Sequence, residues 1–166
     1  MNSMIMENGV TFKTLEKNIF SWVCEIGRQF TTEFLERYDR MLMEERDKKK
    51  YRHKGYRQTT IKTVYGEVTY RRAVCEVTQE DGSRHFVYLL DETLQLDHVG
   101  LISTNMAQLL VKGVTELSYR ECAAKVSEMT GQTISAMGVW NVIQSLGEKV
   151  CEEEAQLVEE HKKGHI

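Results

Sequence analysis

The stretch Gln58-Thr-Thr-Ile-Lys-Thr-Val-Tyr-Gly-Glu-Val-Thr-Tyr-Arg-Arg-Ala-Val-Cys-Glu-Val77 differs in character from the sequence before it. It is rich in Thr, Val, Ile and Tyr, which favour extended backbone, and it has a glycine near its middle. It therefore predicts a β-hairpin that turns near Tyr65-Gly66. A second turn signal, Glu80-Asp-Gly-Ser83, leads into His85-Phe-Val-Tyr-Leu-Leu90 as a third strand. Three strands make a minimal sheet, which needs a helix against one face for stability.

The residues before the hairpin predict a long helix from about Phe12 to Arg46. Apolar residues recur there at steps of three and four, which is one face of an amphipathic helix. They are Leu15, Ile19, Trp22, Ile26, Phe30, Phe34, Tyr38 and Met41. At about 1.5 Å per residue this helix is roughly 50 Å long, which is more than a small domain can bury alone. The first four positions keep heptad spacing, which is compatible with a helix–helix or dimer contact but is too short a run to define a coiled coil.

Helical periodicity returns from Ser103 onwards. Ser103 can cap a helix that runs to about Gly113. Ser118-Tyr-Arg-Glu121 has the form of a capping box, and it predicts a second helix to about Met129. Gly131 suits the left-handed residue that ends such a helix.

A last helix can begin at Thr133 or Ser135. Its apolar stripe is Val139, Ile143, Leu146 and Val150. Three helices with a short second one and a long third one fit a helix-turn-helix unit. The turn Thr130–Ser135 is longer than usual for that motif, and three-helix packing also occurs for reasons unrelated to DNA. The apolar stripes of the first and last helices, including Trp22 and Trp140, are assigned to the core and not to ligand stacking.

Composition is that of a globular protein inside the cell. The chain has 166 residues, 41% of them hydrophobic and 28% charged, which is enough for one ordinary domain or two small ones. It has no apolar run near the roughly 20 residues of a membrane span and no leader-like N-terminus, so we expect a cytoplasmic location. The four cysteines stand singly and are expected to be free thiols: Cys24, Cys75, Cys122 and Cys151.

Positive charge is concentrated in one segment. The formal net charge of the chain is −3, yet Arg46–Arg57 carries seven basic residues and one acid. Residues 46–72 hold ten basic residues against Asp47 and Glu67, a local charge of +8. One interpretation is a solvated helix end and loop. The other is a basic loop that leads into the hairpin and contacts phosphates, with Tyr51 and Tyr56 free to pack on sugars or bases.

Three separated motifs resemble one family. They are Lys50-Tyr-Arg-His-Lys-Gly-Tyr-Arg-Gln-Thr-Thr-Ile-Lys-Thr-Val-Tyr-Gly-Glu-Val-Thr-Tyr-Arg-Arg72, His85-Phe-Val-Tyr-Leu-Leu-Asp-Glu92, and Leu117-Ser-Tyr-Arg-Glu through Ser135-Ala-Met-Gly-Val-Trp-Asn-Val-Ile-Gln144. Together they resemble the N-terminal region of bacterial insertion-sequence transposases of the ISLre type, a group long filed as an uncharacterised protein family. The resemblance covers nearly the whole chain. It implies a region that binds the DNA ends of the element, helps to oligomerise the enzyme and precedes an RNase-H-like catalytic core of the DDE kind.

No catalytic or metal-binding residue is assigned to this chain, because its acidic residues do not converge. The family's catalytic core would follow Ile166, so we expect no cofactor here and divalent metal only in that core. Asp91-Glu92, at the end of a predicted strand, is more simply a helix N-terminal charge or a solvated turn. Glu152, Glu153 and Glu154 are consecutive on a helix and point in different directions. The pair His161 and His165 is assigned to a frayed tail.

The sequence thus predicts an α+β protein in three parts. Residues 1–48 form the long helix, residues 49–92 the basic loop and three-stranded antiparallel sheet, and residues 93–166 a unit of helix-turn-helix type. The alternatives to a DNA-binding region are an oligomerisation module of the same transposase and an inert remnant of a truncated element. The expected partners are double-stranded DNA and further copies of the chain, with no membrane. The candidate DNA-contacting residues are Lys48, Lys49, Lys50, Arg52, Lys54, Arg57, Arg71, Arg72, Ser135, Asn141 and Gln144. Asn141 and Gln144 are candidates because amide side chains can bond adenine edges from a helix in the major groove; the alternative is two solvated positions on a core helix.

Overall fold

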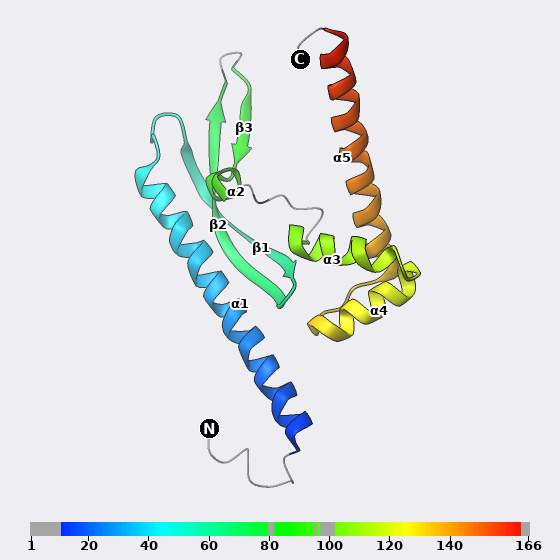
Figure 1. The fold of residues 1–166 in the computed structure, drawn as a ribbon. Helices are drawn as coiled ribbons and strands as arrows, with labels where there is room; N and C mark the ends of the chain where they lie inside the picture. The colour runs from blue at the N-terminus through cyan, green and yellow to red at the C-terminus, as the bar shows by residue number, and fades with distance from the viewer. Residues whose placement is uncertain (1–10, 80–81, 95, 97–101, 164–166) are drawn as a thin grey trace. The chain divides into compact units, whose positions relative to one another are not determined.

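The computed structural model describes residues 11–79, 82–94, 96 and 102–163. The fold is a mixture of helices and one antiparallel sheet, as predicted (Figure 1). The elements in chain order are α1 (Phe12–Glu45), β1 (Arg52–Thr63), β2 (Gly66–Thr78), β3 (Arg84–Val87), α2 (Leu89–Leu94), α3 (Thr104–Val114), α4 (Tyr119–Thr130) and α5 (Ala136–Lys162). They form two compact units. The first unit is Met1–Thr59 with Tyr65–Leu90, and the second is Thr60–Val64 with Asp91–Ile166.

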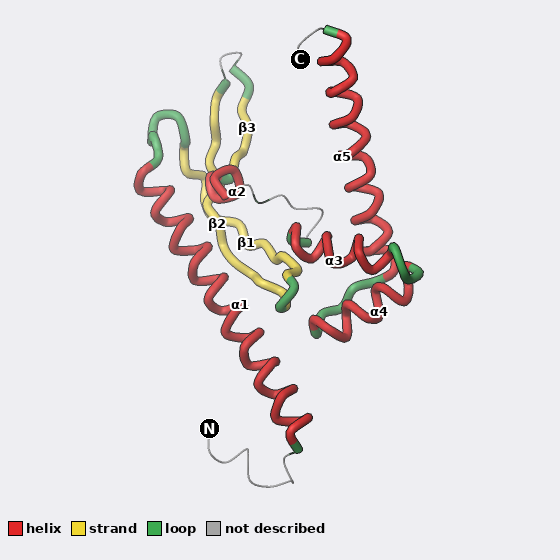
Figure 2. The backbone as a smooth tube through the Cα atoms, in the orientation of Figure 1, coloured by secondary structure: helices red, strands yellow, loops and turns green. Residues whose placement is uncertain are grey.

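The sheet has the strand order β1-β2-β3, shown in yellow in Figure 2. The predicted hairpin is confirmed, since β1 and β2 are joined by a turn at Val64-Tyr65. β2 pairs with β3 in antiparallel register from Cys75 opposite Val87 to Thr78 opposite Arg84. β3 therefore covers only the last part of one edge of β2.

Two predicted boundaries in this region are wrong. β1 begins at Arg52 and not near Gln58, so the second half of the basic run is a strand and not a loop. Pairing with β2 supplies the backbone hydrogen bonds that the weak β propensity of Lys and Gly would not predict. The third strand ends at Val87, and the residues after it form α2, where Leu90 is fully buried and Asp91 and Glu92 lie in the first turn. Acidic side chains are favourable at a helix N-terminus, so the strand stops there.

The bounds predicted for α1 are confirmed, but the face predicted to be covered is wrong. Thr11 caps the helix in a capping box with Thr14. The buried side chains are Leu35, Asp39 and Met43. The predicted apolar stripe is instead largely exposed: Leu15, Ile19, Trp22, Ile26, Phe30, Phe34 and Met41 are exposed, and Tyr38 is half-buried. The assignment of Trp22 and Trp140 to the core is also wrong, because their side chains are 59% and 44% exposed.

The C-terminal half of α1 covers the part of the β2 edge that β3 leaves open. Gln79 N donates to Ser83 O, so the N–H groups of the odd-numbered β2 residues point toward the edge that pairs with β3. The odd-numbered residues nearer the start of β2 lie on the same edge, but there side chains of α1 bond the backbone in place of β3. Thr32 Oγ1 donates to Thr69 O (3.2 Å), Arg71 N donates to Glu36 Oε1 (2.9 Å) and Ala73 N donates to Asp39 Oδ2 (3.0 Å). Steps of three or four residues on a helix advance about 4.5–6 Å, near the roughly 6.6 Å of two strand residues, so the two rows stay in register over these three contacts. The edge is thereby closed to pairing with another strand.

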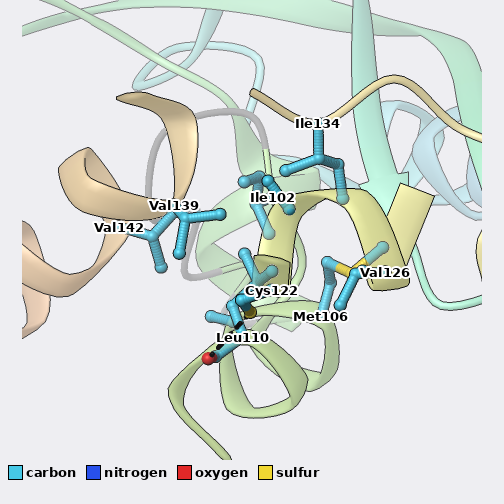
Figure 3. Packing of buried hydrophobic residues seen from close by; sticks show 10 residues of the cluster. Ile102, Met106, Leu110, Cys122, Val126, Ile134, Val139 and Val142 are labelled. Carbon is cyan, nitrogen blue, oxygen red and sulfur yellow. Dashed lines mark hydrogen bonds between the residues drawn. The ribbon is translucent and has the colours of Figure 1, made fainter. Parts of the chain in front are cut away.

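The second unit is built around α3, α4 and α5, and its predicted caps are confirmed. Ser103 caps α3, the Ser118–Glu121 capping box opens α4, and Gly131 at φ 66° ends α4 in the left-handed conformation. Ser135, and not Thr133, caps α5. The core residues are Ile102, Met106, Ala107, Leu110, Cys122, Ala123, Val126, Ile134, Val139 and Val142 (Figure 3).

The long turn before α5 forms hydrogen bonds with α4 and with the end of β1. Ser127 Oγ accepts a hydrogen bond from Ile134 N at 2.9 Å and donates one to Ile134 O at 3.2 Å. Residues of the β1 end also bond this turn: Gln132 Nε2 donates to Thr63 O (2.6 Å) and Lys62 Nζ donates to Thr133 O (2.8 Å). The extra length of the turn relative to a usual helix-turn-helix is thus used to attach it to the end of β1.

The four cysteines are free thiols, as predicted. Cys75 and Cys122 are buried, and Cys122 Sγ donates to Leu110 O at 3.6 Å (Figure 3). Burial raises the pKa of the Cys122 thiol. This cysteine is therefore a packed core residue.

Candidate nucleic-acid interface

The turn between α1 and β1 presents three adjacent lysines. Arg46 closes the turn, because its guanidinium donates to Tyr51 O at 3.2 Å and to Met43 O. Asp47 Oδ1 accepts hydrogen bonds from the backbone N–H groups of Lys49 (2.8 Å) and Lys50 (3.4 Å). The predicted candidates Lys48, Lys49 and Lys50 are all exposed. Arg46 and Asp47 thus shape the turn, and the lysine side chains are left to the solvent side.

The basic run continues along β1 without being covered. Arg52, Lys54 and Arg57 are exposed. Lys54 differs from the other two, because its Nζ lies 3.2 Å from Glu76 Oε2 and the Glu76 side chain is only 8% exposed. A buried carboxylate needs a partner, so Lys54 neutralises a charge inside the first unit. Arg52 and Arg57 form no ion pair with a described residue, which leaves them as the cations of β1 that face outward.

The two arginines at the middle of β2 are used differently. The Arg71 guanidinium lies 5.4 Å from the centroid of the Tyr56 ring, and the Arg71 side chain is exposed. The Arg72 guanidinium lies 3.8 Å from the centroid of the Tyr88 ring and is half-buried. Both are cation–π contacts. Arg71 is accessible to a ligand, whereas Arg72 packs inside the first unit.

Gly55 breaks the alternation of β1 and brings His53 and Tyr56 together. In a regular strand, residues three apart point to opposite faces. The His53 and Tyr56 rings are nevertheless 4.9 Å apart, centroid to centroid, in an edge-to-face contact. Gly55 has φ 121°, a conformation that glycine alone adopts readily, and it permits this local change of side.

A surface cavity of about 200 Å³ lies beside this cluster in the first unit. Its lining residues are Glu36, Asp39, Arg40, Tyr56 and Arg71. Asp39 is 2% exposed. Its Oδ2 accepts the Ala73 N–H, while its Oδ1 has no hydrogen-bond partner among the described residues.

Burial raises the pKa of the Asp39 carboxyl, since removing a carboxylate from water disfavours its charged form. The Ala73 hydrogen bond and the nearby charges of His53 and Arg72 oppose that rise, and Glu36 adds to it. Asp39 is therefore a buried acid with one oxygen bonded to the edge of β2 and the other without a hydrogen-bond partner among the described residues.

The cluster of Asp39, His53 and Tyr56 was not predicted from the sequence. One signal was available. Asp39 stands four residues after Leu35 and four before Met43, so it occupies a position of the buried helical face where an apolar residue is expected. A lone acid at such a position indicates either a structural hydrogen bond or a binding group. For Asp39 the structure shows a structural hydrogen bond, which Ala73 N donates to Oδ2.

The remaining candidates lie in the second unit, at the start of α5. Ser135 Oγ accepts a hydrogen bond from Gly138 N at 3.0 Å, so this side chain is used as the helix cap. Asn141 and Gln144 are exposed. Met137, at 64% exposed, and Trp140 stand beside them. The exposed face at the start of α5 is thus partly apolar and partly amide.

Other predicted features are placed as follows. Asp91 and Glu92 lie in the first turn of α2, and Glu152, Glu153 and Glu154 are exposed along α5. His161 belongs to the last turn of α5, so its assignment to a frayed tail is wrong, while His165 lies outside the described residues. Within the described ranges, no three His, Cys, Asp or Glu side chains are grouped to hold a metal ion. Among the described helices, none is long and apolar enough to cross a bilayer.

Comparison with known proteins gives the family. The family described as "Uncharacterised protein family (UPF0236)" matches residues 5–166. The chain belongs to the UPF0236 family.

Two UPF0236 proteins of Caldanaerobacter subterraneus subsp. tengcongensis are similar to it, at 27% and 26% identity over 145 residues. Each comparison covers 87% of this chain and 30% of the relative, so this UPF0236 chain spans about a third of the length of these relatives. The name of the first relative joins eleven locus designations. No solved structure matches the chain.

Proposed function

We propose that this chain is the DNA-binding region of an insertion-sequence transposase of the ISLre type, and that it recognises the ends of the element. The observation that carries the proposal is the exposed basic surface of the first unit, formed by Lys48, Lys49, Lys50, Arg52 and Arg57. This surface occurs in a chain whose net charge is −3. Neutralising phosphates and releasing their counterions is the main source of affinity for such a surface.

The naming of the first relative supports a mobile element. A DNA segment that inserts copies of itself leaves the same gene at many positions of one genome. Eleven locus designations under one protein name fit that history for the relative. Membership of the same family extends the argument to this chain.

The proposal gives this chain no catalytic role. Strand cleavage by two metal ions needs several carboxylates that converge on ions about 4 Å apart. The proposal places those carboxylates, and the divalent metal, in the part of the longer relatives that the comparisons do not cover. This chain then supplies DNA affinity and positioning.

The salt dependence of duplex binding tests the basic surface. We expect the combined variant Lys48→Ala, Lys49→Ala, Lys50→Ala and Arg52→Ala to reduce the slope of log K against log salt by up to about 3.6, since each lost phosphate contact contributes about 0.9 on B-DNA. Lys54→Ala is the matched control, because Lys54 is paired with Glu76 and should change the slope by much less. An unchanged slope in the combined variant would contradict the proposal.

Within this proposal, Asn141 and Gln144 at the start of α5 contact base edges. Amide side chains bond adenine in the major groove, with about 1–3 kcal/mol of discrimination for a good bidentate pair. We expect Asn141→Ala and Gln144→Ala to weaken binding to an element end more than to a scrambled duplex at the same salt concentration. Equal losses on the two duplexes would remove this helix as the reader.

A second candidate function is oligomerisation of the transposase through α1. All residues from Phe12 to Val23 are exposed, and they include Leu15, Ile19 and Trp22 at heptad spacing. A contiguous exposed apolar face of this kind marks an interaction surface. We expect Ile19→Glu to shift the protein toward the monomer in analytical ultracentrifugation, whereas Ser21→Glu, on the same turns but off the heptad positions, should not. Equal behaviour of the two variants would argue against this interface.

A further inference from the structure

The first three turns of α5 expose one continuous stripe of side chains. Four exposed residues stand at positions i, i+3, i+4 and i+7, which is the spacing of one helix face: Met137, Trp140, Asn141 and Gln144. Val139 and Val142, on the opposite side of the helix, are buried in the core of the second unit. The stripe is therefore a surface that the core does not use. Its first part is apolar, and its second part carries two amides.

A surface hollow of about 310 Å³ lies at the apolar end of this stripe. Its lining comes from the start of α4 and the start of α5: Tyr119, Ala136, Met137 and Trp140. The three large side chains among them, Tyr119, Met137 and Trp140, are all exposed, so a ligand can reach them. Exposed apolar clusters beside polar groups mark interaction sites. The hollow favours a ligand whose apolar group lies next to a hydrogen-bonding edge, because the amides follow it directly on the stripe.

The charge pattern around the stripe is compatible with a phosphate backbone. No charged residue occurs from Gly131 to Gly147, although 28% of the chain is charged. The next acids, Glu148 and Glu152–Glu154, are exposed further along α5. A surface without carboxylates can approach phosphates without repulsion, whereas the acidic part of the helix cannot. Nucleic acid is thus admitted at the start of α5 and disfavoured beyond it.

We propose that the hollow receives the methyl group of a thymine in the major groove of duplex DNA, while Asn141 and Gln144 bond the adenine edge beside it. The inference rests on the proposed function, and it names the base that the start of α5 selects. An A·T base pair presents both features side by side in the major groove, the thymine methyl and the N6 and N7 groups of adenine. Contact with Met137 and Trp140 removes the methyl from water.

Replacing thymine by uracil isolates the contribution of this methyl group. The base pairing, the hydrogen-bonding groups and the phosphate charge of the duplex stay the same. Burying one methyl changes affinity by roughly fourfold, which corresponds to about 0.8 kcal/mol. The wild-type protein should therefore bind an alternating d(A-T) duplex more tightly than an alternating d(A-U) duplex of equal length, by roughly fourfold for each methyl contacted.

Variants of the hollow locate the methyl contact on the protein. In Met137→Ala and in Trp140→Ala, the ratio of d(A-T) to d(A-U) affinity should fall toward one. Met129→Ala is the matched control, because Met129 is an exposed methionine of α4 that does not line the hollow. It should keep the wild-type ratio.

Gln144→Ala separates the amide contact from the methyl contact. Adenine is present in both duplexes, so this variant should weaken both by a similar factor and leave their ratio unchanged. Fluorescence anisotropy of the labelled duplexes at one salt concentration gives all these affinities. Circular dichroism and thermal unfolding confirm that each variant is folded.

Equal binding of the d(A-T) and d(A-U) duplexes by the wild type, with a salt slope that falls in the lysine variant of the turn, would overturn the methyl site and leave the proposed function standing. A preference for d(A-T) that persists in both Met137→Ala and Trp140→Ala would also overturn the site, because the methyl would then act through another contact or through the shape of the duplex. Failure of the wild type to bind any duplex would overturn both the methyl site and the proposed function.

Discussion

The two halves of α1 have similar patterns but different surroundings. Both carry apolar residues at steps of three and four. In the C-terminal half, Leu35, Asp39 and Met43 are buried against the sheet, and three polar side chains bond the edge of β2. In the N-terminal half, Phe12 to Val23 are exposed throughout. Periodicity therefore shows that a helix has a face, but it does not show what covers that face.

The largest effect expected from this difference is in packing. Leu35→Ala should lower the free energy of unfolding by about 2–3 kcal/mol, because it removes a buried side chain and leaves a cavity against the sheet. Ile19→Ala, on the exposed half, should change it by no more than about 0.5 kcal/mol. Urea unfolding of the two variants at a concentration where the protein is monomeric makes the comparison. Similar losses would mean that the N-terminal half is covered as well.

A smaller effect is expected at the open edge of β2. Glu36→Ala removes the acceptor of the Arg71 N–H and should cost about 1 kcal/mol. Glu33→Ala is the control, since Glu33 is an exposed acid of the same helix with no hydrogen bond to the sheet backbone in the described structure. Native-state hydrogen exchange should also show faster exchange of the Arg71 amide in Glu36→Ala. An amide protected equally in both variants would place the edge contact elsewhere.

The smallest expected effect is the pH dependence of stability that comes from Asp39, the buried acid in the same half of α1. The direction of the shift in the pKa of Asp39 fixes the sign of this effect. Burial raises the pKa of Asp39 above its unfolded value, so the folded chain holds more protons than the unfolded chain between the two values. The contribution of Asp39 to the free energy of unfolding therefore falls as pH rises from about 4 through its raised pKa. The Ala73 hydrogen bond and the nearby charges of His53 and Arg72 limit this rise in the pKa of Asp39, and the nearby charge of Glu36 adds to it.

The carboxamide introduced by Asp39→Asn does not titrate. The stability of this variant relative to the wild type should therefore increase as pH rises through that window, in urea unfolding at a series of pH values from about 4 to about 7. A stability difference that stays constant over this range would show that Asp39 has the same pKa in both states.

The features predicted correctly from the sequence depend on near neighbours. The capping box of Ser118 and Glu121, the left-handed Gly131 and the hairpin turn at Val64-Tyr65 each involve residues within a few positions. Backbone geometry and side-chain reach fix such features wherever the segment lies. The concentration of positive charge before the hairpin is likewise a property of composition, and the structure only adds which cations remain exposed.

The features that were missed depend on contacts distant in sequence. The start of β1 at Arg52 follows from pairing with β2, and the use of Lys54 follows from its ion pair with Glu76 on the neighbouring strand. The cavity needs Asp39 of α1, Tyr56 of β1 and Arg71 of β2 at one place. No local pattern specifies that meeting, although the acid at a core position of α1 was visible.

The sequence by itself determined α1, α3, α4 and α5, the caps of α3 and α4, the hairpin and the location of the basic segment, because propensity, turn chemistry and charge act over a few residues. Only the tertiary structure decided which face of α1 is covered, which cations are paired and that Asp39 is buried with one oxygen bonded to the edge of β2. The physical reason is that burial and hydrogen-bond partners are properties of surfaces that meet, and β2 selects the row of α1 side chains whose spacing matches its open edge.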